Sequence, residues 1–141
     1  MGDAPFRVLP QLDDDNRSFW TSGEDGRLRF LRCQACRYFI QPPAPRCPEC
    51  WSADVVPEAL SGEAEVHTFT INHHPWDGGS EPYAIAVVTF AEQEDLRLTT
   101  NIVGCPVEVV HIGMPVRVAF EQHEDVWIPV FEPSDAGEEP A

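Results

Sequence analysis

Four of the five cysteines stand in two close pairs, at residues 33–36 (Cys-Gln-Ala-Cys) and 47–50 (Cys-Pro-Glu-Cys), with ten residues between the pairs. This spacing is typical of a zinc ribbon, because a two-residue gap lets both thiolates of a pair reach one ion. Four sulfur ligands complete a tetrahedral shell and leave no open position for water or substrate. The pattern therefore predicts a structural metal site, without Lewis-acid chemistry, at Cys33, Cys36, Cys47 and Cys50.

The ligand type also bears on which metal is bound. An all-cysteine set with ribbon spacing favours Zn²⁺. The alternative is a rubredoxin-type iron that carries electrons, since residues 47–50 have some likeness to that motif. Rubredoxin has a longer separation between its pairs, and glycine commonly follows each pair, whereas Arg37 and Trp51 follow them here. A red iron–thiolate absorption spectrum would decide for iron.

Short extended segments must hold the two cysteine pairs in place. Residues 28–30 alternate apolar and charged side chains as a strand does, residues 38–40 form a second short strand, and a proline-rich connector at 42–45 leads to the second pair. Together these segments form the ribbon, which we expect at residues 28–52. Earlier in the chain, three aspartates at 13–15 suit the start of a short helix at about 14–22. In that helix Phe19 and Trp20 are expected to pack on the protein's own apolar surface rather than on a partner.

The rest of the chain is mainly β, and the strands are separated by turns rich in glycine, aspartate and glutamate. A five-stranded OB-fold barrel, with a short helical turn between Pro106 and Gly113, fits this order; a β-sandwich is the alternative. We expect an arm and helix at 1–27, the zinc ribbon at 28–52, the OB-fold at 53–133 and a disordered acidic tail at 134–141. The strands are expected at 55–60, 64–74, 83–90, 96–103, 116–122 and 126–131.

Charge limits the classes of partner. The formal net charge is −15, all nine cations are arginine, and the chain from residue 63 onward carries fifteen acids against Arg97 and Arg117. Such a balance disfavours nucleic acid and anionic membrane surfaces. No apolar run reaches the ~20 residues that span a bilayer. No signal sequence is recognisable at the start, so a cytoplasmic location is expected, where paired cysteines indicate metal rather than disulfides.

Other reactive residues give weaker signals. Cys105 is a candidate nucleophile with Glu108 and His111 nearby, but Pro106 and the apolar surroundings favour a packed turn. The adjacent pair at 73–74 (His-His) would point to opposite faces of a strand and makes a poor chelate. The loop at 75–79 carries Trp76 at the expected rim of the barrel, so Trp76 is a candidate for ligand or partner contact, and a solvated hairpin tip is the other interpretation.

The ordered series of these motifs resembles a family. The segments that carry the resemblance, which covers about residues 14–133, are 19–20 (Phe-Trp), 31–36 (Leu-Arg-Cys-Gln-Ala-Cys), 42–50, 82–88, 100–105 and 112–118. The chain resembles the acyl-CoA-associated domains that join a rubredoxin-like zinc ribbon to an OB-fold, long catalogued as a domain of unknown function. Members of that family work beside thiolase-fold enzymes, in acyltransferases, in synthase–thiolase assemblies and in aldolases that shorten sterol side chains held on coenzyme A. Some members are fused to hydratase domains. This sequence carries no hydratase domain, so we expect this chain to act in trans or to be an excised domain.

The resemblance implies a non-catalytic accessory subunit with no catalytic residues of its own. The partner would be a thiolase-fold enzyme, in a heterotetramer, acting as an aldolase (a lyase) or an acyltransferase on a coenzyme A thioester in lipid or steroid degradation. Candidates to meet the phosphates of coenzyme A are Arg29, Arg32, Arg37 and Arg46; the alternatives are that they pair with the acids at 13–15 or offset the charge of the zinc–thiolate site. The candidate ligand or partner contacts are Arg37, Tyr38, Phe39, Ile40, Trp51 and Trp76.

Two other functions stay open from the sequence. A zinc ribbon beside an OB-fold is also a nucleic-acid-binding combination, and strand aromatics such as Phe69 and Tyr83 favour it, although charge does not. A free-standing acyl-CoA enzyme would have to use His73, His74 or Cys105.

Overall fold

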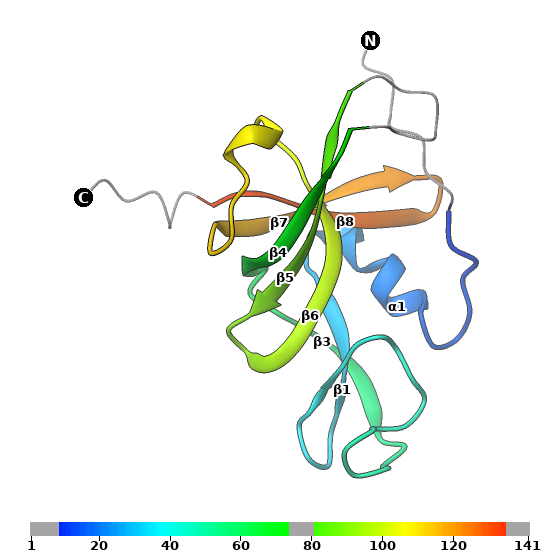
Figure 1. The fold of residues 1–141 in the computed structure, drawn as a ribbon. Helices are drawn as coiled ribbons and strands as arrows, with labels where there is room; N and C mark the ends of the chain where they lie inside the picture. Colours follow the sequence, from blue (N-terminus) through cyan, green and yellow to red (C-terminus); the bar gives the residue numbers. More distant parts are fainter. Residues whose placement is uncertain (1–8, 74–80, 135–141) are drawn as a thin grey trace.

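The computed structural model describes residues 9–73 and 81–134, and Figure 1 shows a ribbon lobe below a barrel lobe. The expected N-terminal arm falls mostly outside these residues, as do His74, Trp76 and nearly all of the acidic tail. The elements are α1 (Arg17–Trp20), the 3₁₀ turn η1 (Ser22–Asp25), β1 (Arg29–Cys33), β2 (Phe39–Ile40), β3 (Val55–Ala59), β4 (Glu63–Asn72), β5 (Tyr83–Phe90), β6 (Gln93–Ile102), the 3₁₀ turn η2 (Val107–Val109), β7 (Pro115–His123) and β8 (Val126–Pro133).

The ribbon is a three-stranded antiparallel sheet in the order β2-β1-β3. Leu31 lies opposite Ile40 in β2 and opposite Pro57 in β3. The strand after the second cysteine pair therefore pairs with the ribbon and not with the barrel. The expected division at residues 52 and 53 remains a prediction about domains, because strand pairing alone does not define a domain.

The second lobe is a closed five-stranded barrel in the order β4-β5-β6-β8-β7. Parallel pairing of β6 with β8, with Ile102 opposite Phe131, closes it. The Val103 N–H donates to the Phe131 carbonyl at 2.8 Å next to this point. The expected barrel is confirmed, the sandwich is wrong, and η2 is the expected helical turn after the third barrel strand.

The N-terminal helix is shorter than expected and begins later. It spans Arg17–Trp20, with Asn16 as its N-cap and no acid in its first turn. Asp13 Oδ1 instead accepts the N–H groups of Asp15 (2.9 Å) and Asn16 (2.8 Å). This local side-chain bonding holds a turn where a helix was expected. The 3₁₀ turn η1 follows α1 and ends at Gly26, whose φ of 80° suits glycine.

Strand β1 serves two hydrophobic cores, one on each face. Phe30 faces the large cluster inside and around the barrel, together with Leu28, Phe39, Phe90 and Phe131. Leu31 and Cys33 face the ribbon's own small cluster. The two lobes are therefore joined through a shared strand as well as by the chain.

The N-terminal turn packs closely on the barrel. A Cβ added at Gly23 would lie 2.5 Å from Phe120 Cδ1 and 2.6 Å from Trp127 Cβ. Only glycine fits there without displacing the turn. Phe19 is 5% exposed, so the expected docking of α1 on the protein's own core is what the structure shows.

Polar contacts also fasten the ribbon to the barrel. The Gln93 side-chain amide accepts the Phe39 N–H at 2.8 Å and donates to the Phe39 carbonyl at 3.0 Å, as a neighbouring strand would. The Tyr38 hydroxyl donates to Asp95 Oδ2 at 2.8 Å. In the described part of the chain, no helix has the length and apolar character needed to cross a membrane.

Candidate metal centre and adjoining cleft

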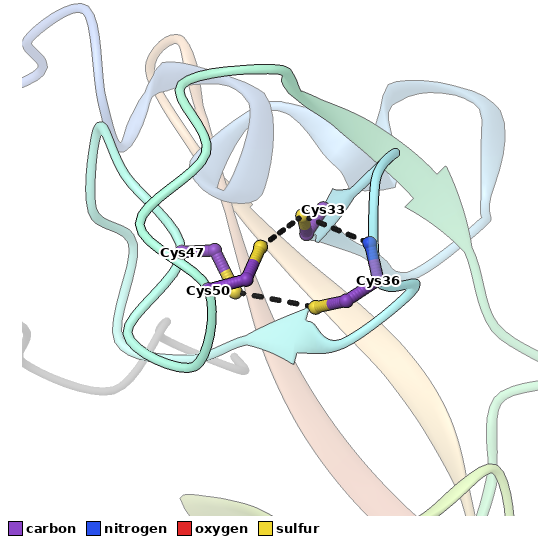
Figure 2. A group of neighbouring side chains, drawn as sticks. All are labelled: Cys33, Cys36, Cys47 and Cys50. Carbon is purple, nitrogen blue, oxygen red and sulfur yellow. Dashed lines mark hydrogen bonds between the residues drawn. The ribbon is translucent and has the colours of Figure 1, made fainter.

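The four paired cysteines converge at the tip of the ribbon lobe, as Figure 2 shows. Their sulfur atoms all lie within 4.8 Å of one another. Cys33 Sγ is 3.5 Å from Cys50 Sγ, and Cys36 Sγ is 3.6 Å from Cys47 Sγ. Each close contact thus joins one pair to the other, which is how two pairs enclose a single ion.

These distances fit a zinc site and not disulfides. A tetrahedron with Zn–S bonds of about 2.3 Å has sulfur–sulfur edges of about 3.8 Å. A disulfide would need about 2.05 Å. All five cysteines are free thiols in the structure. The donor set and its geometry therefore fit structural Zn²⁺ held by Cys33, Cys36, Cys47 and Cys50.

Backbone N–H groups prepare the sulfurs for a cation. The N–H groups of Cys36 (3.4 Å) and Ala35 (3.3 Å) donate to Cys33 Sγ. These bonds, that of Cys36 first, lower the pKa of Cys33 to about 6. The Glu49 N–H donates to Cys47 Sγ at 3.3 Å in the second pair. The two bonds to Cys33 stabilise its thiolate, which is the form that binds metal.

The ribbon arginines are engaged within the protein, but not with the acids at 13–15. Arg37 Nη2 lies 3.0 Å from Glu58 Oε2, and Arg32 Nη1 lies 3.4 Å from Glu58 Oε1. Hydrogen bonding from Gln34, then the Arg37 charge, lowers the pKa of Glu58. Arg29 pairs instead with Asp25, and Arg46 Nη1 donates to the Trp51 carbonyl. Arg37 stays about half exposed, so a phosphate contact there would compete with Glu58.

The apolar candidates for partner contact differ in exposure. Phe39 is 3% exposed, under the Arg32 guanidinium at 4.2 Å, and Ile40 is 2% exposed. Tyr38 is half-buried, and the hydrogen bond to Asp95 raises its pKa to about 12. Trp51, in contrast, is 73% exposed. In this chain by itself, Phe39 and Ile40 are core residues, and Trp51 is the side chain presented outward.

A cleft of about 410 Å³ lies where α1, the ribbon and the barrel meet. Its lining includes Phe19, Trp20, Pro42, Arg97, Thr100 and Pro129. The cleft adjoins the seam between β6 and β8, where the Thr100 hydroxyl donates to the Pro129 carbonyl at 3.0 Å. Sequence reasoning missed it because its walls come from segments far apart in the chain. The one available signal was Arg97, an isolated cation in an acidic region.

Family models and a solved structure match both lobes. The rubredoxin-like zinc ribbon domain of ChsH2 matches residues 20–56, and the C-terminal OB-fold domain of ChsH2 matches residues 57–121. A chain of the Ltp2-ChsH2(DUF35) aldolase superposes with a TM-score of 0.79 at 34% sequence identity, over 89% of this chain and 98% of that chain. This chain belongs to the ChsH2-type DUF35 family.

Two relatives of this DUF35 chain are named as alpha subunits of acyl-CoA hydratases, and a third, from Methanocaldococcus jannaschii and 35% identical over 65% of this chain, is named a DUF35 domain-containing scaffold protein. A probable enoyl-CoA hydratase alpha subunit of Thermomonospora curvata is 35% identical over 95% of this chain. The 3-oxo-4,17-pregnadiene-20-carboxyl-CoA hydratase alpha subunit of Mycobacterium tuberculosis is 28% identical over 94%. The DUF35 chain spans 42% of the length of each. These names and the aldolase support an accessory role beside acyl-CoA enzymes.

The other candidate residues of the DUF35 chain do not assemble into a catalytic set among the described residues. His73 is exposed at the end of β4, and His111 Nδ1 lies 2.9 Å from the Val109 carbonyl. Phe69 packs against the barrel core, and the Tyr83 hydroxyl accepts a hydrogen bond from Asn72 Nδ2. The two aromatics that favoured nucleic-acid binding are thus engaged within the fold.

We expect Cys105 to be a poor nucleophile. Its side chain packs against the barrel core, and burial raises the pKa of the thiol. Because only the thiolate attacks, alkylation by iodoacetamide at pH 8 should be slower than for a free cysteine, and should rise as the pH approaches the raised pKa. Mass spectrometry of the zinc-loaded protein measures this rate. Alkylation faster than that of glutathione would restore the nucleophile hypothesis.

Proposed function

We propose that this DUF35 chain is a non-catalytic accessory subunit that docks on a thiolase-fold enzyme and helps bind or enclose an acyl-CoA substrate. The observation that carries the proposal is the match to a chain of the Ltp2-ChsH2(DUF35) aldolase over 98% of that chain's length. The closed metal centre is consistent with this role, because four cysteine ligands leave no site for substrate. The partner would supply the catalytic groups.

The reaction we propose for the assembly is carbon–carbon bond cleavage of a CoA thioester by a retro-aldol step. Two similar proteins support it: the aldolase, and the pregnadiene-carboxyl-CoA hydratase subunit, whose name points to a steroid side chain. Acyl transfer is the neighbouring possibility, since the family resemblance includes acyltransferase partners. In either reaction this chain would contribute part of the surface that binds the acyl-CoA, would help orient the substrate and would help exclude water from it.

The cleft suggests where this chain would meet the substrate. Trp20, Pro42 and Pro129 contribute apolar lining, and Arg97 is a cationic residue among those that line the cleft. Guanidinium groups bind phosphate in a bidentate manner. Among the described residues, no hydrogen bond or ion pair engages the Arg97 side chain, whereas Arg37 is held by Glu58.

We expect Arg97→Ala to weaken acyl-CoA binding by the assembly about tenfold, because a charge-assisted hydrogen bond contributes roughly 1.5–3 kcal/mol. Arg37→Ala should weaken it as well, by less, since Glu58 already holds that side chain. Isothermal titration calorimetry measures both affinities. The matched control is Arg27→Ala, which removes the same charge from an exposed position outside the cleft. Unchanged affinity in both test variants would rule out phosphate contact at Arg97 and Arg37.

Reconstitution tests the proposed function directly. The chain is mixed with a purified thiolase-fold enzyme from the same cell, and the mass of the complex is measured by light scattering after size exclusion. A stable complex, with the mass of a heterotetramer, and cleavage of a CoA thioester only when both subunits are present would support the proposal. Turnover by the chain alone, or no complex with any thiolase-fold enzyme of that cell, would contradict it.

A further inference from the structure

Two positions in the metal-binding turns have a backbone conformation that favours glycine, but each carries a residue with a side chain. Arg37 has φ 72° and Trp51 has φ 68°, and each directly follows the second cysteine of its pair. The N–H of Arg37 donates to the Cys33 carbonyl, and that of Trp51 to the Cys47 carbonyl, both at 2.9 Å. The turn around the metal therefore imposes a left-handed backbone, which disfavours residues with a Cβ.

Internal contacts account for the side chain at the first position only. Arg37 bonds Gln34 Oε1 at 2.9 Å and pairs with Glu58. Trp51 is 73% exposed and belongs to neither hydrophobic cluster of the described residues. The largest side chain thus occupies a strained position without contributing to the core. Strain that the fold does not need is a reason to look for function.

We propose that Trp51 is the anchor by which the ribbon docks into a pocket on the catalytic partner subunit, an inference that rests on the proposed function. Tryptophan is enriched among the residues that dominate binding energy at protein interfaces. Two hydrogen bonds fix the backbone of Trp51 in the turn after the second cysteine pair. The Trp51 N–H donates to the Cys47 carbonyl, and Arg46 Nη1 donates to the Trp51 carbonyl at 3.0 Å. A side chain presented on a metal-clamped turn loses little backbone freedom on binding.

The distribution of charge indicates what kind of partner surface would accept Trp51. The ribbon strands and turns, residues 28–59, carry four arginines against Glu49, Asp54 and Glu58, and four thiolates around a divalent ion would leave this segment at −1. The chain from residue 63 onward is strongly acidic. A partner pocket with apolar walls and an acceptor for the indole N–H would accept Trp51, and acidic side chains on its rim would repel the barrel far more than the ribbon.

Trp51→Gly separates binding from folding, because glycine removes the indole and also relieves the left-handed strain. The variant should keep one zinc per chain and a melting temperature no lower than that of the wild type. Its dissociation constant for the partner should rise at least about 30-fold, as expected for a dominant interface residue. Surface plasmon resonance with the reconstituted partner measures this. The matched control is Ile112→Ser, which removes another exposed apolar side chain (67% exposed), near η2, and should leave the affinity within about threefold.

Each outcome is decisive. If the wild type binds and zinc-loaded Trp51→Gly binds equally well, the anchor inference is wrong while the proposed function stands. If the wild type binds no thiolase-fold partner, both are overturned. Hydroxyl-radical footprinting of Trp51 in the wild-type complex gives a second measurement that needs no variant. Protection of the indole supports the inference, and unchanged oxidation overturns it.

Discussion

Loss of the metal is expected to unfold the ribbon tip, at about residues 33–56, while the barrel remains folded. The ribbon's own cluster has only four buried members, Leu31, Cys33, Ile40 and Cys47, and two of these are metal ligands. The barrel has a separate and much larger core. Metal removal therefore releases two of the four buried members of the ribbon core, whereas Phe39 is the one buried member of the large core within residues 33–56.

The size of the effect follows from how zinc couples to folding. Binding free energies of about 10–16 kcal/mol are found for structural zinc in small peptides, and they act as folding energy. A two-residue β2 and long connecting turns cannot replace such a contribution. We expect Cys47→Ser, or removal of zinc by a chelator, to abolish the dispersed amide NMR signals of residues 33–56 and to keep those of β4 to β8.

The matched control for this prediction is Cys105→Ser, which removes the one cysteine outside the metal set. Its zinc content, measured by inductively coupled plasma mass spectrometry, should remain one per chain. A metal-free protein with an intact ribbon, or cystines joining the two pairs, would contradict the structural role. An iron–thiolate spectrum would keep the role and change the metal.

The sequence predicted both lobes because each depends on local pattern. Cysteine spacing alone gives the ribbon, since the ligand geometry tolerates few arrangements of two such pairs. Period-two alternation indicates the barrel strands, and in β5 half-buried and buried residues alternate strictly. The observed strand ends differ from the expected ones by at most three residues: both ends of β5 match, and β6 begins at Gln93 instead of residue 96.

Contacts between distant segments could not be predicted in the same way. The partner of residues 55–59 is β1, which only the sheet shows. The Gln93 amide that mimics a strand beside Phe39 lies 54 residues from it in the chain. The cleft likewise combines α1, the ribbon and two barrel strands. The alternation of apolar and polar residues along a strand indicates which residues face a core, but it does not indicate which of the two cores they face.

Phe30→Ala is expected to destabilise the protein by about 3–5 kcal/mol, the usual cost of truncating a buried phenylalanine. Phe30 is 1% exposed and stands in the middle of a chain of aromatic contacts. Its ring centroid lies 5.8 Å from that of Phe19 and 5.5 Å from that of Phe90. Phe90 in turn lies 6.1 Å from Phe131 at the closure of the barrel. A domain stability of about 5–15 kcal/mol makes this loss a large share of the total.

Phe30→Ala should also loosen the packing among α1, the ribbon and the barrel. Phe30 is the ribbon residue that touches both α1, through Phe19, and the barrel, through Phe90. A cavity there removes the packing of α1 while the zinc site, on the other face of β1, keeps its ligands. We therefore expect faster amide exchange at Arg17–Trp20 in Phe30→Ala, with unchanged zinc content.

The neighbouring residue provides the matched control, because β1 sends alternate side chains to different cores. Leu31→Ala removes a 9% exposed side chain from the ribbon cluster and should lower zinc retention without affecting exchange in α1. Urea unfolding followed by tryptophan fluorescence gives the free energies, and hydrogen exchange gives the location. A cost below about 1 kcal/mol for Phe30→Ala would contradict the aromatic joint, since that cost is typical of mutations without a special mechanism. If both variants instead loosened α1 equally, β1 would not separate the two cores, and the rigid presentation of the ribbon to a partner would lose its structural basis.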